Sequence, residues 1–365
     1  MEKVNEKTSL KKEKVKRILV RPYTYLTDSI GDDSVKMIFL LSLQILMLFF
    51  TRTYDSLFVI LAAVMGSVCA NLISIYVYDA FQLEDNFQIP ISIIQGIVTG
   101  MFLPGDYPPF TVFFVTLFVM LFAKHLFGGF ACAWVNPSIC AVLVLWIIGS
   151  RIFPDFLVTH DLISSRNPSQ FMIENGVFPI YRLDPVITET LNNTVFGLFK
   201  VSIPEGYVSL LWDTGSSIPA FRFNLISMLS SIVIFSDELS KGLSSLAFIV
   251  MYALLVRFAF PLMFGFSDVK GDVLLSLLTG GTLFCCTFVI GWYGTNPMTI
   301  GGKVIYGSLA GIFALLVAGC GTSPSGMIFT VMIVNILSVF IQQFEVRYDR
   351  KRMERLMEKR MAAEK

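Results

Sequence analysis

Apolar stretches separated by short polar breaks run along most of this chain. Ten of them can be distinguished, in two sets of five, and a helix that crosses a bilayer needs roughly 20 residues of this kind. The first set covers residues 37–50, 56–77, 87–103, 110–124 and 131–152, and the second covers 222–235, 243–264, 273–290, 304–319 and 326–344. The pattern predicts an all-α polytopic membrane protein of about ten transmembrane helices, arranged as two five-helix repeats.

Two of these stretches, the third and the sixth, contain residues that weaken a helix in lipid. The third holds Gln88, Pro90, Gln95 and Gly96. Broken helices are tolerated at membrane depth where they line a cavity or pack inside protein. We therefore expect the third and sixth helices to be interrupted.

Composition supports the membrane assignment, because 55% of the residues are apolar, 15% are charged and the mean hydropathy is +0.70. Residues 1–21 carry 8 basic and 3 acidic side chains, and residues 345–365 carry 8 and 5. Lys and Arg in short flanks favour the cytoplasmic side. An even number of crossings agrees with both termini lying there.

The charge pattern and the apolar stretches together divide the chain into five parts. They are a basic cytoplasmic tail at 1–35, a first transmembrane repeat at 36–152, an extracytoplasmic loop at 153–219, a second transmembrane repeat at 220–344 and a cytoplasmic tail at 345–365.

Several kinds of chemistry find no support. The six cysteines lie within or beside apolar segments without the spacing of a metal or cluster site, and His125 and His160 belong to no ligand motif. Phosphate-binding glycine loops and hydrolase signatures are absent from the sequence. We expect plain buried thiols, no metal site and no nucleic-acid partner.

One polar run breaks the apolar pattern of the long loop. It reads LWDTGSSIPAF, residues 211–221, and places Thr214, Gly215, Ser216 and Ser217 between apolar neighbours. Residues of these types form turns and cap helices, so the run is explained structurally as a turn that caps the sixth helix. They are also the types expected of an exposed hydroxyl that accepts a modification on a flexible backbone.

Three further stretches, read in order, resemble one family. They are GIVTGMFLPGDYPP at 96–109, AKHLFGGFACAWVNPS at 123–138 with Asn136, and LLTGGTLFCCTFVIGWYGTNPMTIGGKVIYG at 277–307. This order resembles the D subunit of the Rnf ferredoxin:NAD oxidoreductase, which is homologous to the B subunit of the sodium-pumping NADH:quinone oxidoreductase. The similarity covers about three quarters of the chain.

The resemblance implies a fold and a function. The family fold is similar to that of urea-transporter-type channels, with two five-helix repeats. The chain would be one membrane subunit of a redox-driven translocase in the bacterial cytoplasmic (inner) membrane, carrying electrons through flavin and coupling them to Na⁺ or H⁺ transport. It would act only with the other subunits of the complex, including a second flavin-bearing subunit.

The resemblance also gives the polar run of the long loop a role. In the family, a flavin transferase attaches FMN through its phosphate to the last residue of a Ser-Gly-Ala-Thr motif. Thr214, Gly215, Ser216 and Ser217 stand at the four corresponding places, so Ser217 would carry FMN. The acceptor is Ser in place of Thr, and Asp213 is adjacent to the motif where the family has an Asp three residues before it. A second flavin such as riboflavin is a further possible cofactor.

Other polar residues are weighed in the same way. Arg257 lies inside the seventh apolar stretch, where it would meet a flavin phosphate or extend to the outer interface. Asn136 and Thr299 belong to the second and third motifs and are counted among the cofactor-binding candidates. Asn296 stands where the family has an Asp, and the missing carboxylate puts in doubt a role for this loop in coupling electron flow to ion transport. Glu238 matches a family Glu between the sixth and seventh spans.

Two rival functions stay open. One is a channel or transporter for a small neutral solute on the same scaffold, which loss of the flavin acceptor would favour. The other is a structural subunit that holds the complex together without a cofactor.

Overall fold

The computed structural model of the chain describes residues 30–78, 88–126, 135–155, 176–200, 202–237, 239–263, 271–291, 294–319 and 323–363. Several residues considered above lie outside these ranges: His160, Glu238, Cys132 and Cys320. Of the remaining cysteines, Cys285 and Cys286 are buried as expected, and Cys69 and Cys140 are partly buried. No strand is present in the described ranges.

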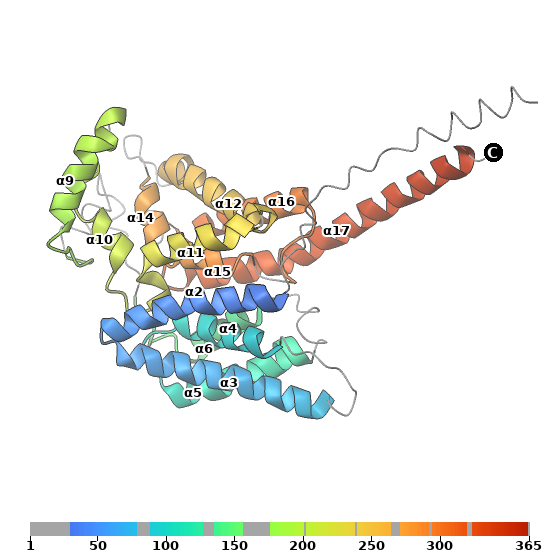
Figure 1. The fold of residues 1–365 in the computed structure, drawn as a ribbon, viewed down its shortest axis with the longest axis horizontal. Coiled ribbons are helices and arrows are strands. Elements are labelled where there is room, and N and C mark those ends of the chain that lie inside the picture. Colours follow the sequence, from blue (N-terminus) through green and yellow to red (C-terminus); the bar gives the residue numbers. More distant parts are fainter. Residues whose placement is uncertain are drawn as a thin grey trace, which may run out of the picture.

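The described helices of the first half lie together as one bundle (Figure 1). They are α2 (Ile30–Phe50), α3 (Tyr54–Tyr78), α4 (Gln88–Met101), α5 (Pro109–Met120) with its π-helical end η2 (Leu121–His125), and α6 (Pro137–Ile148). Glycines let α3 and α4 approach closely. A Cβ added to Gly96 would lie 2.5 Å from the Cα of Val64, and one on Gly100 would lie 2.5 Å from the Cα of Ile60.

The expected interruption of the third and sixth stretches is wrong. The third forms one continuous helix, α4, because Pro90 falls in the first turn, where its missing N–H costs no intrahelical hydrogen bond. The sixth forms α11 (Asn224–Asp237), which is also continuous.

Within the described ranges, the second half consists of α11 and seven further helical segments. They are α12 (Leu239–Leu254) with η6 (Leu255–Ala259) and α13 (Phe260–Met263), then α14 (Val273–Leu278), α15 (Thr282–Phe288), α16 (Ile300–Ala318) and α17 (Gly326–Ala363). The stretch 273–290, expected to be one helix, is divided between α14 and α15. Gly280 and Gly281 occupy the break with positive φ angles of 64° and 70°, a conformation that glycine adopts without strain.

Short helices fill the described part of the long loop. They are α9 (Asp184–Thr194), η4 (Phe196–Phe199), α10 (Tyr207–Trp212) and η5 (Pro219–Phe221). In Figure 1, α9 lies at one end of the molecule, and α17 extends beyond the other labelled helices at the opposite end.

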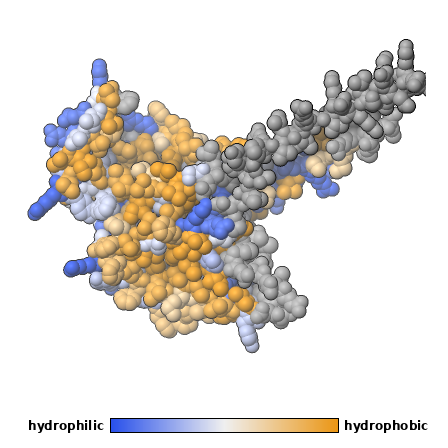
Figure 2. All heavy atoms as spheres, viewed as in Figure 1, coloured by the Kyte–Doolittle hydropathy of each residue, from blue (hydrophilic) through white to orange (hydrophobic). Residues whose placement is uncertain are grey.

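Length and composition of the helices agree with a membrane-spanning protein. Within the described ranges, five helices are long and apolar enough to cross a membrane and four shorter apolar helices accompany them. Figure 2 shows apolar residues covering the middle of one face. The large apolar core joins both halves, with Leu41, Ile94 and Phe102 from the first and Phe221, Phe284 and Val334 from the second. The predicted all-α polytopic fold is confirmed, while the domain boundaries remain predictions.

Candidate functional site

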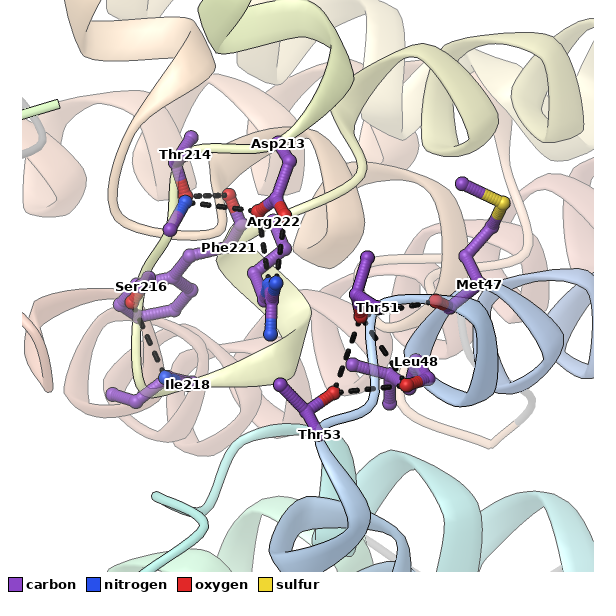
Figure 3. A network of polar contacts seen from close by, with 11 residues as sticks. Met47, Leu48, Thr51, Thr53, Asp213, Thr214, Ser216, Ile218, Phe221 and Arg222 are labelled. Carbon is purple, nitrogen blue, oxygen red and sulfur yellow. Dashed lines mark hydrogen bonds and ion pairs between the residues drawn. The ribbon is translucent and has the colours of Figure 1, made fainter. Parts of the chain in front are cut away.

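The polar run of the long loop forms a compact turn between α10 and η5 (Figure 3). The Asp213 Oδ1 atom accepts a hydrogen bond of 2.8 Å from the Gly215 amide, and the Ser216 Oγ accepts one of 3.2 Å from the Ile218 amide. Gly215 has a φ of +67°, which a residue with a side chain rarely adopts. The glycine therefore allows the chain to reverse at this point.

A buried ion pair fixes both ends of this turn. The Arg222 Nε donates to the Asp213 Oδ1 over 2.9 Å, and its Nη2 donates to Oδ2 over 2.6 Å. Asp213 is 4% exposed and Arg222 is 8% exposed. Such a two-point contact is stronger and more directional than a single hydrogen bond. The sequence analysis did not predict this pair, because Arg222 falls at the predicted start of the sixth span. The sequence feature that could have indicated it is the presence of two opposite charges at the edge of an apolar stretch.

The three hydroxyl groups of the turn differ in access. The Thr214 Oγ1 donates 2.9 Å to the Phe221 carbonyl and its side chain is buried, so this hydroxyl is engaged inside the protein. Ser216 is half-buried, and Ser217 is exposed. Ser217 is therefore the hydroxyl that the fold presents outward, at the position the sequence favours.

The sequence analysis considered that this turn caps the sixth helix, α11. The side chains of the turn form no such cap. The side chains of Asp213, Thr214 and Ser216 bond to Gly215, Ile218, Phe221 and Arg222, all of which precede α11.

Two of the three family-like motifs pack against this turn. The Gly105 amide of the first motif donates 3.3 Å to the Ser217 carbonyl. In the third motif, a Cβ on Gly281 would lie 2.6 Å from the Phe221 ring and 3.5 Å from Phe102. The structure thus brings the first motif, the third motif and the hydroxyl-bearing turn together.

A second buried carboxylate lies beside the start of α10, the helix that precedes the turn. Asp184 is 1% exposed and accepts hydrogen bonds from the Gly206 amide, from the Ser209 amide and hydroxyl, and from the Thr188 hydroxyl. Burial alone raises the pKa of this carboxyl, but the hydrogen bonds outweigh it and hold the pKa below its usual value. Asp184 thereby ties α9 to the start of α10.

The other candidate residues lie elsewhere. Arg257 is exposed in η6 and its Nη1 donates 3.4 Å to the Gly271 carbonyl, an arrangement suited to an interfacial arginine. Asn136 is buried as the N-cap of α6, where its Oδ1 accepts from the Ser138 amide. Within the described ranges its Nδ2 has no hydrogen-bond partner.

Thr299 caps the start of α16, where its Oγ1 accepts 3.0 Å from the Gly302 amide. Glu345 of α17 accepts hydrogen bonds from the Thr299 hydroxyl, the Thr299 amide and the Met298 amide. A carboxylate at a helix N-terminus is electrostatically favourable. Asn296 replaces the family Asp of this loop, but Glu345 of α17 brings a carboxylate to the same loop. The spacing of these residues in the sequence did not predict this contact.

No hydrogen bond or ion pair among the described residues joins Arg257, Asn136 or Thr299 to the turn that carries Ser217. The part of the chain that the structure describes also holds no group of three or more His, Cys, Asp or Glu side chains placed to bind a metal.

Comparisons with known proteins show the family of the chain. The model of the NQR2, RnfD, RnfE family matches residues 18–350. The D subunit of the ion-translocating oxidoreductase complex of Sodalis glossinidius (strain morsitans) is 25% identical over 272 residues, which cover 69% of this chain and 75% of the relative. The proteins of the same name from Actinobacillus pleuropneumoniae serotype 7 (strain AP76) and Shewanella pealeana (strain ATCC 700345 / ANG-SQ1) are 22% and 21% identical, again over 69% of this chain and over 76% and 75% of their own lengths. The expected resemblance is confirmed, and the chain belongs to the NQR2, RnfD, RnfE family.

Proposed function

We propose that this chain is a membrane subunit of an Rnf-type ion-translocating oxidoreductase complex and that Ser217 carries covalently attached FMN. The first part is supported by membership of the family and by the names of the relatives. It makes the chain one part of a redox-driven translocase, dependent on the other subunits.

The observation that carries the flavin proposal is the contrast between Thr214 and Ser217. Thr214 is buried and hydrogen-bonded, whereas Ser217 is exposed on a turn braced by the buried Asp213–Arg222 pair. Attachment requires the Ser217 Oγ to bond to phosphorus while its proton leaves and a phosphoanhydride bond of the flavin donor breaks. An exposed hydroxyl on a fixed turn can enter a transferase active site, and Ser217 meets that requirement.

Bound flavin would supply one- and two-electron chemistry at the membrane surface. The chain's own contribution is to hold the attachment point in position beside Gly105 and Phe221. We further propose that electrons reach it from a flavin on a neighbouring subunit, that Na⁺ or H⁺ movement is coupled to their flow, and that the complex lies in the bacterial inner membrane with Ser217 outside the cytoplasm.

The flavin proposal is tested by co-expressing the full chain with a flavin transferase and measuring in-gel fluorescence and peptide mass. The wild-type chain should carry one flavin mass on the peptide containing Ser217. Ser217→Ala should abolish it, because the acceptor oxygen is removed from an exposed site.

Ser216→Ala is the matched control and should retain the flavin. Flavin that persists in Ser217→Ala, or is lost only in Ser216→Ala, would assign the attachment to another hydroxyl. A wild-type chain without flavin would favour the cofactor-free structural subunit or the non-redox channel.

A further inference from the structure

A lysine side chain is enclosed within the bundle formed by the helices of the first half. Lys124 lies in η2, the π-helical end of α5, and is only 1% exposed. Its Nζ donates 2.9 Å to the Ser92 Oγ of α4. Among the described residues this hydroxyl is its one hydrogen-bond partner, and no carboxylate pairs with it. A buried ammonium without a counter-charge is costly, so such a residue inside a membrane-spanning bundle indicates a function.

Polar side chains of α3 and α4 meet beside this lysine. The Ser67 Oγ of α3 donates 2.8 Å to the Ser92 carbonyl of α4. Asn71 lies one turn beyond Ser67 on the same face of α3, and Gln95 lies one turn beyond Ser92 on the same face of α4. A seam of polar groups therefore runs through an otherwise apolar bundle.

Several atoms of this seam have no hydrogen-bond partner among the described residues. They are both side-chain atoms of Asn71, the Gln95 Oε1 and the Thr116 Oγ1, and all three residues are at most 1% exposed. Thr116 packs against α3, because a Cβ on Gly66 would lie 3.2 Å from the Thr116 Cβ. Buried polar groups almost always bond to protein or to ordered water, so these donors and acceptors are suited to holding water molecules.

The charges around Lys124 determine which ion the seam could carry. In the described helices α3 to α6 the one acidic side chain is Asp55, in the first turn of α3. The other ionisable groups on the elements that contact η2 are His125, next to the lysine, and the thiols of Cys69 and Cys140. A fixed positive charge repels Na⁺, which also prefers carboxylate oxygens, whereas a lysine amine can itself take up and release a proton.

We propose that Lys124 carries protons through the bundle of α3 to α6, exchanging them with water molecules held by Asn71, Gln95 and Thr116. The Lys124 Nζ receives a proton from one water molecule and releases a proton to another, while no electron moves and no other bond changes. The ion carried along this seam is then H⁺. The inference rests on the proposed function, because electron flow through the complex supplies the driving force.

The test uses inverted membrane vesicles that contain the full chain together with the other subunits of its complex. Reduced ferredoxin and NAD start the reaction, NADH formation measures electron transfer, and a pH-sensitive dye measures proton entry in sodium-free buffer. The wild type should acidify the vesicles. Lys124→Met should lower the number of protons moved per NADH by roughly tenfold or more, because the proton-carrying group is removed.

Lys124→Arg separates proton transfer from a structural role. The guanidinium keeps the positive charge and can still donate to Ser92, but it does not release its proton. Proton movement per NADH should therefore fall as far as in Lys124→Met. Lys351→Met is the control, because Lys351 is exposed on α17, and it should move protons as the wild type does.

Asn71→Leu tests the seam without changing the lysine. It replaces two unpartnered buried atoms by an apolar group of similar size, so the chain should unfold at a temperature at least as high as that of the wild type. Proton movement per NADH should nevertheless fall. This variant decides the matter if the Lys124 variants do not assemble with their partner subunits.

Three results would overturn the inference. They are proton movement at the wild-type level in Lys124→Arg, the same in Asn71→Leu, and a wild-type complex that takes up radioactive sodium but no protons during electron transfer. The last result would leave the proposed function intact. A wild-type complex that forms no NADH would contradict the proposed function itself, and with it the inference that depends on it.

Discussion

At the scale of single residues, the Asp213–Arg222 pair determines the shape of the loop that presents Ser217. Both groups are nearly removed from solvent, so each is stable only beside the other. Asp213 also accepts from the Gly215 amide, which joins the ion pair to the reversal of the chain. Loss of either charge would therefore affect the turn as well as the pair.

Arg222→Met should lower the free energy of unfolding by roughly 3–5 kcal/mol, because it leaves a buried carboxylate without its cation. The midpoint of thermal unfolding in detergent measures the effect. Asp213→Asn/Arg222→Met should recover part of the loss, since no unpaired charge then remains buried.

Arg350→Met is a suitable control, because Arg350 pairs with Glu354 at 3.3 Å on the exposed part of α17. Exposed pairs contribute little, so its unfolding midpoint should hardly change. An Arg222→Met midpoint as high as that of Arg350→Met would show that the buried pair is not needed to hold the turn.

The hydroxyl-bearing run could be recognised in the sequence, but the ion pair that holds it in place was not predicted. The residue types of 213–217 are those of a turn, and Ser217 was recognisable from its place in the motif. The Asp213–Arg222 pair joins residues only nine apart, and two opposite charges at the edge of an apolar stretch were its signal. The Thr299–Glu345 contact joins α16 to α17, and it does not follow from local spacing, because only the packed structure brings these elements together.

At the scale of elements, the division between α14 and α15 is the main departure from the sequence pattern. The stretch 273–290 is continuously apolar, and hydrophobic periodicity does not distinguish one long helix from two short ones. Gly280 and Gly281 break it because Phe221 packs where a side chain at position 281 would lie. The break thus accommodates the end of the hydroxyl-bearing loop.

Gly281→Ala should reduce stability by roughly 1–3 kcal/mol, because a Cβ there would lie 2.6 Å from the Phe221 ring on a residue with a φ of +70°. A lower midpoint of thermal unfolding is the expected result. Gly301→Ala is the matched control, since a Cβ at Gly301 meets nothing within 4 Å and alanine favours the helix. Equal midpoints for the two variants would contradict the packing argument.

At the scale of the whole molecule, the order of apolar stretches was sufficient to predict the class of fold. The described helices follow that order, with α14 and α15 together taking the place of one crossing. Helix ends were less predictable, because four of the apolar helices have only 10–17 residues. Helices of this length are shorter than the roughly 20 residues that a straight crossing needs.

Orientation can be tested with single cysteines on two exposed helices. Glu189→Cys on α9 should react with an impermeant maleimide in intact cells, because basic termini favour the cytoplasmic side and the predicted topology then has α9 outside it. Arg355→Cys on α17 should react only after the membrane is permeabilised. Labelling is scored against the unmodified chain, which contains native cysteines. The reverse pattern would invert the topology and place Ser217 in the cytoplasm.

The long helix α17 has a mechanical consequence. Beyond Glu345, which is bonded to the start of α16, it continues as far as Ala363. At 1.5 Å per residue, that is a rigid arm of nearly 30 Å. A tilt of about 10° at the Thr299–Glu345 contact would displace the tip of such an arm by about 5 Å. Small movements at the start of α16 would be amplified at the far end of α17.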